Sequence, residues 1–182
     1  GELLTGGKDG SVRMWTLTQS APKWEVSGHL GPIRSVAFTS DGRLAATAGE
    51  DGAVRLWDAE TGRPVGLSFR HEVALRHVEF SPDGRRLLVL CASREGRAVE
   101  QRIKAPSRES AAGGGGRVRV WDLQTGDPEW DFVHPEGLVA AHFNPNGGSI
   151  LTATDTGNLC VWSLNDDGLP RRLGEPLPFE TR

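Results

Sequence analysis

The sequence of 182 residues lacks several features that would point to particular classes of protein. No stretch approaches the roughly 20 consecutive apolar residues of a membrane-spanning helix, so no membrane partner is expected. There is no basic excess either, because 21 Lys and Arg stand against 24 Asp and Glu, and a broad nucleic-acid surface is therefore not expected. The first residues, GELLTGGKDG, lack the charged-then-apolar pattern of a secretion signal.

Cysteine is also scarce, with only Cys91 and Cys160 in the whole chain. They occur in separate apolar runs and lack the spacing of metal ligands, so we interpret them as buried free thiols in a reducing compartment. The expected location is therefore cytoplasmic, and neither a metal nor a cofactor is expected.

Turn-forming residues are abundant, with 24 Gly and 11 Pro, and no helical periodicity accompanies them. This combination favours an all-β chain. The chain also repeats itself: Trp15 and Trp57 are 42 residues apart, and so are His29 and His71. A period of this length is the signature of a repeat architecture.

Within the cleanest repeat, four short strands are separated by Gly- and Asp-containing turns. They are expected over residues 33–38, 43–49, 53–58 and 63–71, and the first of them, IRSVAF, alternates with a period of two. One repeat unit of about 40 residues is therefore a four-stranded antiparallel meander.

The repeats resemble the WD-repeat family. The matching motifs are GH at Gly28-His29, SPDG at Ser81 to Gly84 with its variant TSDG at Thr39 to Gly42, and WD at Trp57-Asp58 and Trp121-Asp122. The resemblance covers essentially the whole chain and implies a β-propeller, in which each blade is a sheet with strands a, b, c and d from the hub outward.

On this resemblance, residues 1–182 form one propeller segment of about 3.75 blades and 15 strands. Blade 1 (residues 1–28) lacks strand a, blade 2 covers 29–70, blade 3 covers 71–133 with an insertion at 93–116, and blade 4 covers 134–182. Because such rings often have seven blades, the segment is expected to belong to a larger ring. That ring is completed either by missing blades of a longer polypeptide or by another chain.

The resemblance also implies a buried hydrogen-bonded tetrad of His, Ser/Thr, Asp and Trp in each blade. Its members by motif position are His29, Thr47, Asp51 and Trp57 in blade 2, Thr5, Asp9 and Trp15 in blade 1, His71 and Trp121 in blade 3, and His134, Thr152 and Trp162 in blade 4. In blade 4, Thr156 replaces the Asp, and in blade 3 the insertion removes it.

The same residue types occur in catalytic triads, but here they recur once per blade, whereas an active site is assembled once. We therefore interpret the tetrads as structural and expect no catalytic residues. His77 and His142 lie on strand-a patterns and either line the central channel or pack in a blade. No carboxylate or cysteine pairing in the sequence supports metal binding by these two histidines.

The insertion has five basic residues against three acidic ones and few apolar side chains. A disordered surface loop is the simplest interpretation. The alternative is a docking arm, because the b–c and d–a loops lie on the same face, which WD-repeat proteins commonly use for partners. A basic arm there favours an acidic or phosphorylated partner.

The leading hypothesis is therefore a non-catalytic scaffold that binds a protein or peptide on this face. The candidate contacts are Leu30, Arg34, Glu72 and Arg76, together with Arg94, Arg97, Arg102, Lys104 and Arg108 of the insertion. One alternative is a regulatory or sensor module of a larger enzyme, such as a bacterial serine/threonine kinase. Another is a propeller enzyme with a metal in its channel.

Overall fold

A computed structural model describes residues 1–92, 115–164, 171–175 and 177–178. These residues form four antiparallel sheets, which we number in chain order. The first sheet contains β1 (Glu2–Gly6), β2 (Ser11–Thr16) and β3 (Pro22–Ser27), and the second contains β4 (Ile33–Phe38), β5 (Leu44–Gly49), β6 (Ala53–Asp58) and β7 (Pro64–Arg70). The third contains β8 (Leu75–Phe80), β9 (Arg86–Cys91), β10 (Arg117–Asp122) and β11 (Pro128–Val133).

The fourth sheet contains β12 (Leu138–Phe143), β13 (Ser149–Thr154), β14 (Asn158–Ser163), β15 (Arg171–Arg172) and β16 (Leu177–Pro178). The expected single outer strand of this sheet is thus two short strands, both paired with β14. The described residues hold 16 strands instead of the expected 15 for this reason. The expectation of an all-β chain built from antiparallel sheets is confirmed.

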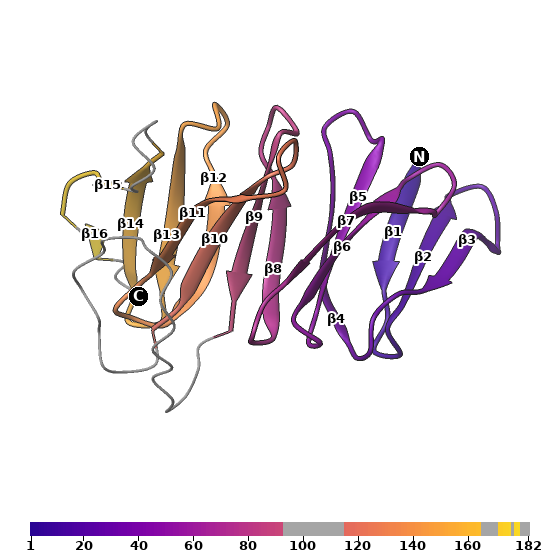
Figure 1. The fold of residues 1–182 in the computed structure, drawn as a ribbon, viewed down its shortest axis with the longest axis horizontal. Helices are drawn as coiled ribbons and strands as arrows, with labels where there is room; N and C mark the ends of the chain where they lie inside the picture. The colour runs from indigo at the N-terminus through magenta and orange to yellow at the C-terminus, as the bar shows by residue number, and fades with distance from the viewer. Residues whose placement is uncertain (93–114, 165–170, 176, 179–182) are drawn as a thin grey trace.

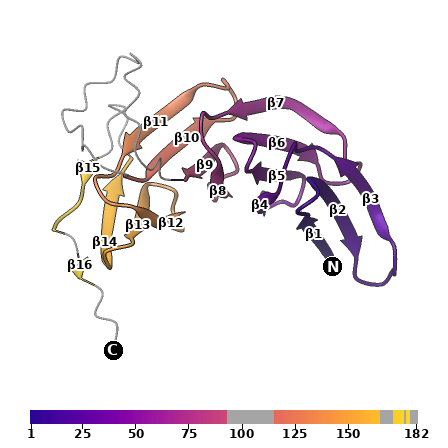
Figure 2. The ribbon, with the colours of Figure 1, turned by 90° about the horizontal axis from the view of Figure 1, so that it is seen from below.

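The four sheets stand side by side, with β1 and β14 near opposite ends of the row (Figure 1). Seen from below, the row bends into an arc (Figure 2). The inner strands β1, β4, β8 and β12 lie on its concave side, and β3, β7 and β11 lie on its convex side. No helix among the described residues is long and apolar enough to cross a membrane.

Each pair of neighbouring sheets shares one apolar core. Strand alternation points one set of side chains toward each neighbour, so Val54 and Leu56 of the second sheet pack with Val78 and Leu87 of the third. Similar cores join the first sheet to the second and the third to the fourth. Burial between sheets therefore holds the arc together.

The connections divide between two rims, which we call lower and upper as Figure 1 shows them. The lower rim carries the β3–β4, β5–β6, β7–β8 and β11–β12 connections, and the upper rim carries the turns β4–β5, β6–β7, β8–β9 and β10–β11. At the lower rim, a Cβ on Gly52 would lie 2.5 Å from the carbonyl oxygen of His71, and Gly52 has φ +71°. Only glycine fits this turn, which lets the loop before β8 pack closely on β6.

Candidate functional site

The four expected tetrad residues of the second sheet are joined in one buried network. Trp57 donates from Nε1 to Thr47 Oγ1 (2.9 Å), and the same oxygen lies 2.7 Å from His29 Nε2. His29 Nδ1 lies 2.9 Å from Asp51 Oδ1. Because indole can only donate, the Thr47 hydroxyl accepts from Trp57 and donates to His29, which leaves the Nδ1 proton of His29 for Asp51.

Electrostatics support the same arrangement. Burial opposes the charge on Asp51, but hydrogen bonds from His29 and from the N–H groups of Leu30 and Ala53 bring the pKa of Asp51 well below its usual range. The pKa of His29 is lowered, mainly by burial, with Asp51 acting in the opposite direction. The network is therefore a neutral imidazole beside a stabilised carboxylate.

His29 also ties two sheets together. Its N–H donates to the carbonyl of Gly10 in the first sheet (3.2 Å), while its side chain enters the second sheet. The N–H of His71 makes the same contact with Gly52 (2.8 Å), and the N–H of His134 makes it with Gly116 (2.7 Å). The histidine therefore has a structural role at each of these junctions.

The first and fourth sheets retain part of the network. Trp15 donates to Thr5 Oγ1, and Trp162 donates to Thr152 Oγ1, both at 2.9 Å. Asp9 accepts from Ser11 and Arg13 of its own sheet, and the hydrogen bonds from Ser11 lower its pKa to about 2.

In the fourth sheet, His134 turns toward its own loop. Its Nδ1 accepts from the N–H of Glu136 (3.1 Å), and Glu136 in turn accepts a short hydrogen bond from Thr156. Thr156, at the position of the missing Asp, therefore bonds to the side chain of Glu136, while His134 bonds to its backbone N–H.

The third sheet brings His71 and Trp121 together but leaves them without the network. Val89 stands where Thr47 stands in the second sheet, and it offers no hydroxyl. His71 Nε2 and Trp121 Nε1 are buried and have no hydrogen-bond partner among the described residues. Their rings meet edge to face at 5.7 Å, and burial lowers the pKa of His71 to about 4, with Arg119 and Arg117 acting in the same direction.

A different polar cluster occupies the third sheet. Arg117 and Arg119 both donate to the carboxylate of Asp131, with distances from 2.6 to 3.0 Å. Arg119 also lies over the Trp121 ring, at 5.3 Å from its centroid. These contacts are within one sheet, unlike the histidine contacts, which join two sheets.

Two predicted partner contacts, Arg34 and Arg76, occupy equivalent bulges at the start of the inner strands. The pairing of β4 with β5 jumps from Ile33 to Ser35, and that of β8 with β9 jumps from Leu75 to His77. The skipped residue in each case is the arginine. A bulge releases its extra residue from the ladder and redirects its side chain, so both arginines are exposed at the lower rim.

The same two arginines line one hollow of about 310 Å³ between the second and third sheets, together with Glu50, Ala74, Leu75 and Ala92. Arg34 donates from Nε to Glu50 Oε1 (2.8 Å), and Arg76 lies 3.4 Å from the carbonyl oxygen of Leu138. Leu30 is 88% exposed, and Glu72 is exposed in the loop before β8. The hollow is therefore a charged recess with an apolar floor.

Ala92, the last described residue before the insertion, also lines this hollow. The five predicted contacts of the insertion, Arg94, Arg97, Arg102, Lys104 and Arg108, lie outside the described residues. Sequence reasoning missed Glu50 as a member of the rim; its position in the turn after β5, beside the inner-strand arginine, is the signal that identifies it.

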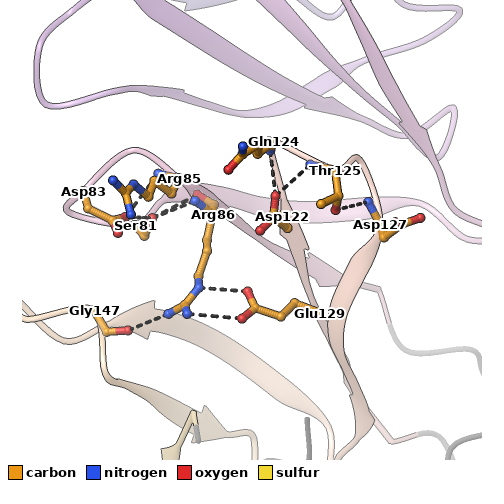
Figure 3. A network of polar contacts seen from close by, with 10 residues as sticks. All are labelled: Ser81, Asp83, Arg85, Arg86, Asp122, Gln124, Thr125, Asp127, Glu129 and Gly147. Atoms are coloured by element: carbon orange, nitrogen blue, oxygen red, sulfur yellow. Dashed lines mark hydrogen bonds and ion pairs between the residues drawn. The ribbon is translucent and has the colours of Figure 1, made fainter. Parts of the chain in front are cut away.

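A second hollow, of about 410 Å³, lies on the upper rim of the third sheet (Figure 3). Three of its charged side chains already bond to neighbouring side chains or to backbone groups of the turns. Asp83 accepts from Ser81 (2.6 Å), Asp122 accepts from the N–H of Gln124 (2.6 Å), and Arg86 pairs with Glu129 (2.8 Å). These contacts hold the β8–β9 and β10–β11 turns, and we assign this hollow a structural role.

Residues 20–58 match the family model described as WD domain, G-beta repeat. The match begins just before β3 and ends with β6, so it contains the outer strand of one sheet and the three inner strands of the next. This offset explains why the GH histidine contacts two sheets. The four antiparallel sheets are consistent with blades of a partial WD-repeat propeller.

Proposed function

We propose that this WD-repeat chain is a non-catalytic scaffold that binds a protein or peptide at the lower rim, over the hollow between the second and third sheets. WD-repeat domains generally bind protein partners and are generally not catalytic. Arg34 and Arg76 are the central contacts, and Leu30, which is 88% exposed in the connection before β4, is a further candidate contact.

The observation that carries the proposal is the repeated bulge. Bulges cost ladder hydrogen bonds and are common where a sheet aims a side chain at a binding site. The inner strands of three sheets share this bulge, and in two neighbouring sheets its extra residue is an arginine that lines the same hollow. Arginine is well suited to carboxylate and phosphate groups, because its planar donors bind both oxygens at once.

The expected ligand is therefore an extended segment with an acidic or phosphorylated side chain. Arg34 is held by Glu50, so it enters the complex already oriented. Ala92, the residue before the basic insertion, lines the same hollow, and the five basic residues of the insertion against its three acidic ones add attraction for an anionic partner.

A catalytic use of the tetrads is not supported by their geometry. His29 and Thr47 are buried and already bonded to other members of the network. A nucleophile and its base need access to a substrate, whereas these groups satisfy each other.

The test compares binding of matched peptides by fluorescence anisotropy, with each acidic or phosphorylated peptide paired with its amide or unmodified counterpart. The wild-type chain should prefer the anionic member, and Arg34→Ala and Arg76→Ala should each weaken that binding by roughly tenfold. Arg43→Ala is the matched control, because Arg43 is 85% exposed on the upper rim. Equal losses in all three variants, or no preference for anionic peptides, would contradict the proposal.

We also propose that further blades complete the ring. Leu3 of β1 and Leu151 of β13 are 50% and 40% exposed, and each points away from the core that its neighbour Leu4 or Ile150 enters. Apolar outer faces of a repeat array are normally covered. A molar mass above the single-chain value of 19.6 kDa, measured by light scattering, would show that other copies of the chain cover these faces. A monomer that binds no hydrophobic dye would contradict ring completion.

A further inference from the structure

Three metal-binding side chains meet between the inner strands of the third and fourth sheets. His142 Nδ1 lies 2.9 Å from Glu79 Oε2, and His77 Nε2 lies 3.5 Å from the same oxygen. The three potential ligand atoms all lie within 4.8 Å of one another. His77 and Glu79 belong to β8 and His142 belongs to β12, so the cluster bridges two sheets.

The strand pattern explains why these residues meet. His77 and Glu79 are two apart on β8, which puts them on the same face. His142 precedes the last residue of β12, just as Glu79 precedes the last residue of β8, so the two occupy equivalent levels of neighbouring sheets. Sequence reasoning overlooked Glu79 as the partner of His77 on the same strand, and the proximity of Glu79 to His142 arises only when the sheets dock.

Ser35 on β4 orients His77 from the other side. Its hydroxyl oxygen accepts from the N–H of Val78 (3.2 Å) and lies 3.4 Å from His77 Nδ1. With the His77 proton on Nδ1 and directed at Ser35, Nε2 carries a lone pair. That atom is buried and has no hydrogen-bond partner among the described residues, although it lies near the Glu79 carboxylate. Two electron-rich atoms in such proximity attract a cation between them.

We propose that His77, Glu79 and His142 bind a divalent transition metal, with Zn²⁺ the best fit. Two imidazoles and one carboxylate form a known type of zinc ligand set, in which the fourth position is left to water or another ligand. Tetrahedral coordination at ~2.0–2.1 Å puts ligand atoms roughly 3.4 Å apart, close to the separations between Glu79 and the two histidines. The His142 side chain is 54% exposed, so the fourth position faces solvent.

Ser35 then serves as a positioning residue. A metal-bound histidine commonly donates its second ring N–H to an oxygen, which fixes the tautomer and the ring orientation. Ser35 is on the second sheet, so its contact with His77 extends the site across three neighbouring sheets. Metal binding should therefore stabilise the docking of these sheets, because a ligand that binds only the folded state raises its stability.

The test begins with the full chain after treatment with a chelator. Titration calorimetry with ZnSO₄ should give one equivalent per chain, and thermal unfolding should shift upward when Zn²⁺ is added. Titration with Co²⁺ should give the visible absorption of a tetrahedral site. His142→Gln is the primary variant, because this exposed side chain can be changed with little effect on folding, and it should weaken Zn²⁺ binding by at least about tenfold.

Glu79→Gln keeps both histidines and the side-chain shape, and should cause a similar loss of Zn²⁺ affinity. Glu60→Gln is its matched control, since Glu60 is 77% exposed on another turn, and should leave the affinity unchanged. Ser35→Ala should weaken Zn²⁺ binding less than the loss of a ligand does, and should shift the Co²⁺ spectrum. Absence of stoichiometric binding, or affinity unchanged in both His142→Gln and Glu79→Gln, would overturn the proposal.

Discussion

Trp57 and Trp121 occupy the same position in neighbouring sheets, yet their indole N–H groups differ in hydrogen bonding. The N–H of Trp57 has Thr47 as its acceptor, whereas that of Trp121 has none among the described residues, because Val89 replaces the threonine. The strand order of the two sheets is the same. The network is therefore not what specifies the sheet.

Apolar burial is what the two sheets have in common. Leu56 of the second sheet and Val89 of the third are members of one core, in which Val89 is fully buried. Replacing a buried polar group by an apolar one costs little as long as its partners are also satisfied or replaced. In the third sheet the threonine has been replaced while the histidine and the tryptophan are kept, and among the described residues His71 Nε2 and Trp121 Nε1 have no hydrogen-bond partner.

The largest expected effect is that of Trp57→Ala. Trp57 is 4% exposed, and its ring packs so closely on Gly28 that a Cβ added there would lie 2.5 Å from it. Truncation therefore leaves a cavity at the junction of two sheets. We expect a loss of about 3–5 kcal/mol in the free energy of unfolding, measured by urea denaturation. Trp121→Phe provides the comparison: it removes an N–H that has no partner among the described residues and should cost less than Trp57→Phe. Equal costs for the two Phe variants would contradict this difference.

The next largest effect is on pH dependence. The pKa of His71 is about 4 in the folded chain against an ordinary 6.5, so the unfolded chain binds more protons between these values. Its contribution to stability is complete above pH 6.5 and is lost as the pH falls toward 4, by up to about 3 kcal/mol. The midpoint of urea denaturation, plotted against pH across this range, should change less steeply in His71→Gln than in the wild-type chain. In His29→Gln the slope should change less, since Asp51 opposes the effect of burial on His29.

A reciprocal exchange isolates the hydroxyl itself. Thr47→Val should lower the free energy of unfolding by about 2–3 kcal/mol, because it leaves the Trp57 N–H and His29 Nε2 without their hydrogen-bond partner. Val89→Thr should instead raise the unfolding free energy by about 1 kcal/mol, because the new oxygen would accept from Trp121. Thermal unfolding of both variants checks the signs. A destabilised Val89→Thr would mean that Trp121 and His71 do not converge on that position.

The smallest effect is expected from shortening the insertion. Arg117 pairs directly with Cys91, so removing residues 94–114 leaves a four-residue connection between β9 and β10. Such hairpin loops are common, and the entropic cost of a long loop changes by only about 0.6 kcal/mol for each doubling of length. The melting temperature should therefore stay nearly constant. A large fall would show that the insertion packs against the sheets.

The sequence predicted much of the fold because its signals are local. A ten-residue spacing links Thr and Trp in three sheets, at 5 and 15, 47 and 57, and 152 and 162. In the third sheet, the insertion separates the two strands and conceals that Val89 occupies the threonine position. The 42-residue period from Thr47 reaches Val89 directly, so the signal was present in the sequence.

The candidate site was only partly predictable for a related reason. Arg34 and Arg76 were identified from their place at the start of the inner strands. That each is the extra residue of a bulge, skipped in the strand pairing, was not predicted from the sequence. Glu50 joined them through a contact across the strands of the second sheet. Residues of the insertion remain predictions.

The sequence by itself determined the strands, their turns and their period, because alternation, glycine turns and the repeated motifs depend on neighbours along the chain. Only the tertiary structure decided which side chains meet across sheets. The hollow between Arg34 and Arg76, and the approach of Glu79 to His142, depend on how packed faces dock. Docking is set by the fit of many buried side chains together, and no local pattern encodes that fit.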